Sequence, residues 1–111
     1  MSQRLNKVNS LIQQSFGEVL QRQADLPPDV LVTISRVDTT KNLQRTTIWL
    51  YVTPFERADG VLADLEGQLY DLQGFLNRAL HLRPLPRIKL RIDKGAEHAD
   101  HIESLLKHIS Q

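Results

Sequence analysis

The sequence predicts a two-layer α+β fold in which helices cover one face of a three-stranded sheet. Two long segments, 3–23 and 59–82, carry apolar residues three and four positions apart, which is the spacing of an amphipathic helix. Three shorter segments, 30–37, 46–53 and 87–93, are rich in branched residues or alternate apolar with polar residues, as half-buried strands do. Because one face of such a sheet can bury every helical stripe, the two-layer sandwich is the architecture we expect.

Length and composition favour one compact domain over residues 1–111. Hydrophobic residues make up 41% of the chain, which is enough for one core, and cysteine is absent, which fits a reducing compartment. No apolar run is long enough to cross a bilayer, and the first residues lack the apolar core of a signal peptide. We therefore expect a cytoplasmic protein that does not bind membranes.

The first helix is expected over residues 3–23. Pro27 and Pro28 end it, because neither ring has an amide hydrogen and each disfavours helix in the preceding residue. Its apolar stripe consists of Leu5, Val8, Leu11, Ile12, Phe16, Val19 and Leu20.

The segments 30–37 and 46–53 are expected to pair as a hairpin around a short polar turn. If the branched apolar residues of the second strand point toward the helices, alternation turns Thr47, Trp49 and Tyr51 to the opposite face. That face of the sheet is expected to stay open.

A second helical segment begins near Asp59, which can cap it, and its leucine spacing continues to about residue 82. It contains Gly67 and Gly74, and a glycine inside a helix costs about 1 kcal/mol relative to alanine. Two such glycines indicate a kink or a break. We expect it at Gly74, so that one long segment becomes two helices.

The remaining segments complete the fold. Pro84 and Pro86 form a rigid turn, and alternation in 87–93 turns Lys89 and Arg91 to the open face. A short closing helix is expected over residues 98–109. The expected element order is αββααβα, with a mixed sheet.

Positive charge is concentrated in residues 72–92. This segment has four Arg, one Lys and one His but no acid, whereas the net charge of the whole chain is only +1. Such a concentration is typical of a surface that binds a polyanion, and phosphate contacts supply most non-specific affinity for nucleic acid. The alternative is a solvated face balanced by acids elsewhere. Asp64, Glu66 and Asp71 precede the expected break, however, which leaves one end of the molecule basic.

Two other groups of residues could extend this surface. Trp49 and Tyr51, beside the outward cations of the third strand, could stack on unpaired bases, although a covered or dimeric sheet face explains them equally well. Arg4 and Lys7 lie at helical spacing near the start of the chain and could reach the same anion. Ordinary surface charge is the alternative for this pair.

No catalytic or metal site is expected. His98 and His101 lie one helical turn apart near Glu97 and Asp100, but a solvated helix face explains them better than a metal site does. No Ser or His stands in a nucleophile motif, and no Gly-rich loop suits a phosphate cradle. We therefore expect a monomeric protein without cofactor, metal or small-molecule substrate.

A resemblance to a known family runs through nearly the whole chain. Residues 4–8 (Arg-Leu-Asn-Lys-Val) are similar to the opening helix of that family, and 32–37 and 48–50 are similar to its hairpin. Residues 74–78 (Gly-Phe-Leu-Asn-Arg) and 82–88 (Leu-Arg-Pro-Leu-Pro-Arg-Ile) are similar to its kinked helix and to the lead into its last strand. On these residues the chain resembles ribosome-binding factor A of bacteria and organelles.

The resemblance implies a type II KH-like domain in which an Ala-x-Gly kink between two helices replaces the usual Gly-x-x-Gly loop. It also implies a non-catalytic factor that binds the free small (30S) ribosomal subunit and 16S rRNA during late maturation and rRNA processing, including cold adaptation. The kink here reads Leu72-Gln73-Gly74, with leucine in place of the family's alanine. We expect this leucine to alter the kink or to narrow the approach to RNA.

The residues expected to bind RNA follow from the charge pattern and the resemblance together. Gly74 permits close approach of the backbone, and Arg4 and Lys7 extend the surface. The residues expected to hold phosphates are Arg78, Arg83, Arg87, Lys89 and Arg91. The competing hypothesis is a protein-interaction module that uses the open sheet face or an exposed strand edge.

Overall fold

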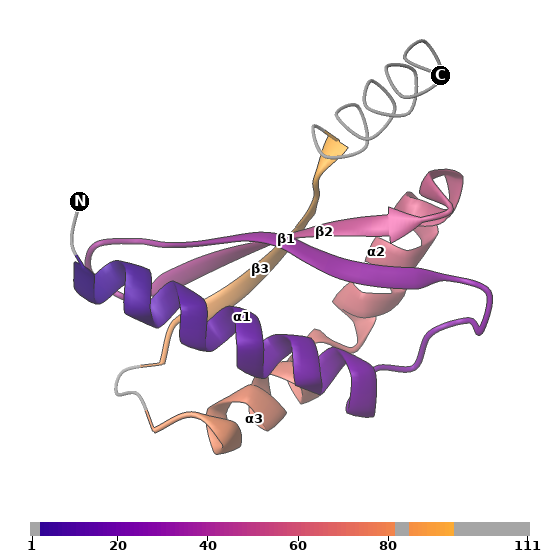
Figure 1. Cartoon of the computed structure of the whole chain (residues 1–111). Helices are drawn as coiled ribbons and strands as arrows, with labels where there is room; N and C mark the ends of the chain where they lie inside the picture. The colour runs from indigo at the N-terminus through magenta and orange to yellow at the C-terminus, as the bar shows by residue number, and fades with distance from the viewer. Residues whose placement is uncertain (1–2, 82–84, 95–111) are drawn as a thin grey trace, which may run out of the picture.

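The computed structural model describes residues 3–81 and 85–94, and its elements follow the expected order as far as the third strand (Figure 1). The elements are α1 (Gln3–Gln23), β1 (Leu31–Thr39), β2 (Arg45–Thr53), a short 3-10 helix η1 (Phe55–Arg57), α2 (Ala58–Gly67), α3 (Leu69–Ala79) and β3 (Arg87–Ile92). The closing helix expected over residues 98–109 lies outside the described residues.

The three strands form one mixed sheet in the order β1-β2-β3. β1 and β2 are antiparallel, as expected of a hairpin, whereas β2 and β3 are parallel. Parallel neighbours need a crossover connection, which α2 and α3 provide. The α+β fold with a mixed sheet is therefore confirmed.

The helices form a layer against one face of this sheet (Figure 1). α1 packs against β1 and α3, while α2 packs against β3 and β2. Leu11, expected in the buried stripe of α1, is instead 45% exposed. The side chains buried between the two layers include Ile12, Phe16, Ile48, Leu50, Val52, Val61, Leu65, Leu72, Leu76, Ile88 and Leu90.

A β-bulge interrupts the pairing of β1 with β2. Arg36 pairs with Trp49, and the register shifts between Ile34 and Arg36, so Ser35 is an extra residue on β1. The extra residue reverses the alternation that follows it, because successive side chains point to opposite faces. Val37 is consequently buried and Arg36 is exposed.

The long central helix breaks at Gln68 and not at Gly74, which lies inside α3. The side chain of Gln68 pairs with the backbone of Asp25: its Oε1 accepts from the amide (2.7 Å), and its Nε2 donates to the carbonyl (2.8 Å). This pair of hydrogen bonds ties the junction between α2 and α3 to the connection after α1. The break expected at Gly74 was wrong, because Leu72 and Leu76 pack in the core on either side of that glycine and α3 continues through it.

The turn between β1 and β2 is closed by its own residues. Asn42 Oδ1 accepts hydrogen bonds from Thr40 Oγ1 (2.6 Å) and from the Gln44 amide (3.1 Å), and the Thr40 amide donates to the Arg45 carbonyl (2.9 Å). Leu43 adopts φ 59°, a left-handed conformation that costs a non-glycine residue about 1–2 kcal/mol. Its side chain packs against the core, which offsets this cost. The turn places Arg45 at the start of β2.

Candidate nucleic-acid interface

The open face of the sheet carries the outward side chains of β2 and β3. Alternate residues of β2 from Thr46 to Val52 are fully buried, whereas Thr47, Trp49 and Tyr51 between them are half-buried. β3 alternates in the same way and exposes its three basic residues. Alternation in the sequence predicted that Thr47, Trp49, Tyr51, Lys89 and Arg91 point away from the helices, and this prediction is confirmed.

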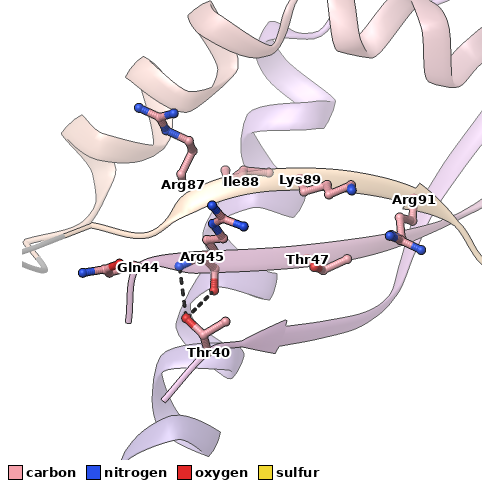
Figure 2. A pocket seen from close by; sticks show the side chains of 8 residues that line it. All are labelled: Thr40, Gln44, Arg45, Thr47, Arg87, Ile88, Lys89 and Arg91. Carbon is pink, nitrogen blue, oxygen red and sulfur yellow. Dashed lines mark hydrogen bonds between the residues drawn. The ribbon is translucent and has the colours of Figure 1, made fainter. Parts of the chain in front are cut away.

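The register of β2 and β3 brings basic side chains from both strands together. Arg45 pairs with Arg87, and Lys89, the next outward residue of β3, pairs with Thr47. In Figure 2 the Arg45 side chain extends from β2 toward β3, while Arg91 extends back over β2. These side chains border an open groove of about 620 Å³, which we call the basic groove. It is lined by Thr40, Gln44, Arg45, Thr47, Arg87, Ile88, Lys89 and Arg91 (Figure 2).

The basic residues that line the groove make no salt bridge within the described part of the chain. Arg45, Arg87, Lys89 and Arg91 are all exposed, and within residues 3–81 and 85–94 none of them forms a salt bridge. Asp38, an exposed residue of β1, belongs to the same sheet face, and Asp93 follows β3 and accepts a hydrogen bond at Oδ2 from Ser35 Oγ of β1 (2.7 Å). Four cations outweigh these two acids and make the groove electropositive, as a surface that follows a chain of phosphates must be.

The edge strand β3 is held in place by Gln73 of α3. Its Oε1 accepts a hydrogen bond from the Ile88 amide (2.9 Å), and its Nε2 donates to the Pro86 carbonyl (3.1 Å). Between these two residues, the Arg87 amide donates to the Gln44 carbonyl (2.9 Å) beside β2. One side-chain amide thus satisfies backbone groups that an edge strand would leave unpaired. It also fixes the end of β3 that carries Arg87, a lining residue of the basic groove.

Trp49 is in contact with a basic residue on the open face. The Arg36 guanidinium carbon lies 4.0 Å from the centroid of the indole ring. Arg36 is exposed and Trp49 is half-buried, as is Tyr51 two residues further along β2. Base stacking on Trp49 and Tyr51 therefore stays a prediction, and any such contact at Trp49 involves Arg36.

Gly74 and Arg78 lie on α3, in the helix layer, and not in the basic groove. The Arg78 guanidinium carbon is 4.8 Å from the centroid of the Phe75 ring. With Tyr70, which is 91% exposed, these residues border a separate hollow of about 350 Å³ that shares no lining residue with the basic groove. The Leu72 side chain is buried in the core, which places it away from any surface that RNA could approach, and its expected effect on the kink stays a prediction.

The remaining predicted residues do not join the basic groove either. Arg4 and Lys7 are exposed on α1, which packs on the face of the sheet opposite to Lys89 and Arg91. Arg83 lies outside the described residues. The structure thus divides one predicted surface into a sheet face, a hollow on α3 and the exposed side of α1. The role of each in RNA binding stays a prediction.

Two basic residues of the open face, Arg45 and Arg36, are not among those predicted from the sequence. Arg45 could have been found by extending the outward alternation of Trp49 and Thr47 one step back. Arg36 could not, because strict alternation places it on the core side. Only the bulge at Ser35 turns it outward.

The described part of the chain has no group of three or more His, Asp or Glu side chains that could hold a metal ion. None of its helices is long and apolar enough to cross a membrane. His98 and His101 lie outside the described residues.

The order of elements and the mixed sheet define a class of small α+β domains with an open, electropositive sheet face, and they are consistent with a KH-like fold. The model of one protein family, described as Ribosome-binding factor A, matches residues 4–106. The chain therefore belongs to the ribosome-binding factor A family.

One curated relative agrees with this assignment, and two solved structures agree with the fold. Ribosome-binding factor A of Akkermansia muciniphila is 30% identical over 111 residues, which cover 100% of this chain and 88% of that protein. The crystal structure of ribosome-binding factor A from Thermus thermophilus has a TM-score of 0.69 and 21% identity, covering 79% of this chain and 93% of that chain. A Thermus thermophilus homology model fitted into a cryo-EM map of a 30S–RbfA complex has a TM-score of 0.65 and 22% identity, covering 78% of this chain and 91% of that chain.

Proposed function

We propose that this chain is a non-catalytic ribosome assembly factor that binds the free small (30S) subunit through 16S rRNA. Residues 1–111 form a single domain, which acts as a monomer in the cytoplasm. It takes part in late maturation of the subunit and in rRNA processing, and also in adaptation to cold. Family membership supports the proposal. The Thermus thermophilus homology model fitted into a cryo-EM map of a 30S–RbfA complex supports the choice of subunit.

The basic groove is the observation that carries the proposal. Its four cations come from two adjacent strands, are exposed and have no salt-bridge partner in the described chain. Cations arranged in this way can neutralise successive phosphates and release the counterions that surround RNA. The groove is open and polar, whereas small-molecule sites are enclosed and mostly apolar. An RNA backbone suits it better than a metabolite does.

Such a factor acts by selecting among conformations of the rRNA. If the basic groove fits the phosphate positions of an immature subunit better than those of the mature one, binding increases the population of the immature form. Completion of folding moves the phosphates, weakens the contacts and releases the factor. No catalytic group is required for this cycle.

Co-sedimentation with purified small subunits tests the proposal. The wild-type chain should co-migrate at low salt and dissociate at high salt, because phosphate contacts are salt-dependent. Arg91→Glu should weaken this association. The matched control is Arg22→Glu, which makes the same charge change at an exposed residue in the last turn of α1. Failure of the wild type to co-migrate at low salt contradicts the proposal. If both variants lose the same amount of subunit binding, the basic groove is not the binding surface.

One observation favours the alternative, a protein-interaction module. β1 is an edge strand of the sheet, and Leu31 at its start is 64% exposed. An exposed edge can pair with a strand of another chain. If Trp49→Ala abolishes self-association or partner capture while subunit binding persists, the open face serves a protein partner and the alternative holds.

A further inference from the structure

The bulge in β1 determines which side chain lies beside Trp49. Without it, Ser35 would stand opposite the indole and Arg36 would point toward the core. The extra residue instead pairs Arg36 with Trp49 and brings its guanidinium carbon to 4.0 Å from the ring centroid. Bulges commonly re-aim a side chain near a functional site. Here the bulge places the planar guanidinium group of Arg36 over the indole ring of Trp49, and we call this pair the stack.

This stack offers a flat surface that is already assembled. Trp49 is half-buried on the central strand, whereas Arg36 is exposed to solvent. A guanidinium group is planar, weakly hydrated and able to stack on aromatic rings, including nucleobases. Because the indole already holds Arg36 in one orientation, a base that stacks here loses less conformational freedom than it would on a mobile arginine.

The stack is also continuous with the basic groove. Trp49 pairs with Arg36 on one side and with Arg91, a lining residue of the groove, on the other. Neighbouring strands are about 5 Å apart, so a base at Trp49 and a phosphate at Arg91 fit within one nucleotide. An aromatic platform beside a cationic groove is the arrangement that binds single strands.

We propose that Arg36 and Trp49 form a stacking platform for an unpaired nucleotide of RNA, whose phosphate is held by Arg91. This inference rests on the proposed function, because it names the form of RNA that the open sheet face recognises. Unpaired RNA can stack a base on the platform, whereas the bases of a duplex are stacked on each other and cannot. The open face therefore prefers single-stranded to double-stranded RNA of equal length.

Trp49 is the only tryptophan of the chain, so its fluorescence reports directly on the platform. A short oligouridylate should quench Trp49 emission as it binds, and an RNA duplex of the same length should bind with little quenching. Arg36→Lys keeps the charge but loses the flat group. It should weaken oligouridylate binding about tenfold, the usual effect of losing one stacked base, without changing the salt dependence. Arg22→Lys is the matched control and should bind as the wild type does.

Two results would contradict the proposal that Arg36 and Trp49 form a stacking platform. One is oligouridylate binding that leaves Trp49 emission unchanged, and the other is an Arg36→Lys variant that binds as tightly as the wild type. Circular dichroism of each variant establishes that it is folded. If either result is found while the chain still co-sediments with small subunits, the platform is rejected and the proposed function is retained. Quenching by oligouridylate without co-sedimentation supports the platform and contradicts the proposed function.

Discussion

Leu72 is 1% exposed and packs with the other buried side chains between the helices and the sheet. Two residues further along α3, Gly74 is half-buried, and the nearest atom that a Cβ added there would meet is Arg78 Nη1 at 3.9 Å. One residue of the Leu-Gln-Gly sequence thus serves the core and another borders the hollow on α3. Gln73 between them holds the edge of β3. Three consecutive residues thus have three different structural roles.

Leu72→Ala, which introduces the residue expected in the family, should lower the free energy of unfolding by about 2–5 kcal/mol. The reason is the cavity that the smaller side chain leaves in a packed core. Urea denaturation measures the loss, and Leu11→Ala is the control because Leu11 is 45% exposed on α1. RNA affinity measured under folding conditions should not change, since Leu72 does not line the basic groove. Equal stability of the two variants would place Leu72 outside the core.

At the scale of elements, the sequence is sufficient to predict the structure where the pattern that determines it is local. The bounds of α1, the hairpin and the inward and outward residues of β2 and β3 all follow from periodicity. The junction between α2 and α3 does not, because the hydrogen bonds of Gln68 with Asp25 join residues far apart in the chain. Glycine propensity alone favours Gly67 and Gly74 equally as the place of a break. Tertiary contacts decide between them.

Gly67→Ala should raise the free energy of unfolding by about 0.4–1 kcal/mol. Gly67 is the last residue of α2, its φ is not positive, and a Cβ there would have no heavy atom within 4 Å. Alanine therefore reduces the conformational entropy of the unfolded chain without strain in the folded one. Thermal denaturation measures the gain. A loss of stability would show that the junction needs the freedom of glycine in addition to the contacts of Gln68.

At the scale of the whole molecule, the basic residues are distributed over both layers. The sequence identifies Lys89 and Arg91 as outward because alternation is local to β3. It cannot place them relative to Arg4 and Lys7, since that requires knowing which face of the sheet α1 covers. Alternation also turns Arg45 outward, but only the register with β3 shows that Arg45 lines the basic groove. The charge pattern predicts a polyanion, and only the tertiary structure shows which basic residues share a face.

The two layers can be compared by the salt dependence of RNA binding. The logarithm of affinity falls with the logarithm of salt concentration, with a slope of about 0.7–0.9 per phosphate contact. Replacing Arg45 and Lys89 by Ala on the open face should flatten that slope by about the value of two contacts. Replacing Arg4 and Lys7 by Ala on α1 removes the same charge and should flatten the slope only if RNA also contacts the helix layer. Filter binding to 16S rRNA at several salt concentrations measures both double variants. Equal flattening would show that RNA contacts both layers, and flattening by the α1 variant alone would move the interface from the sheet to the helices.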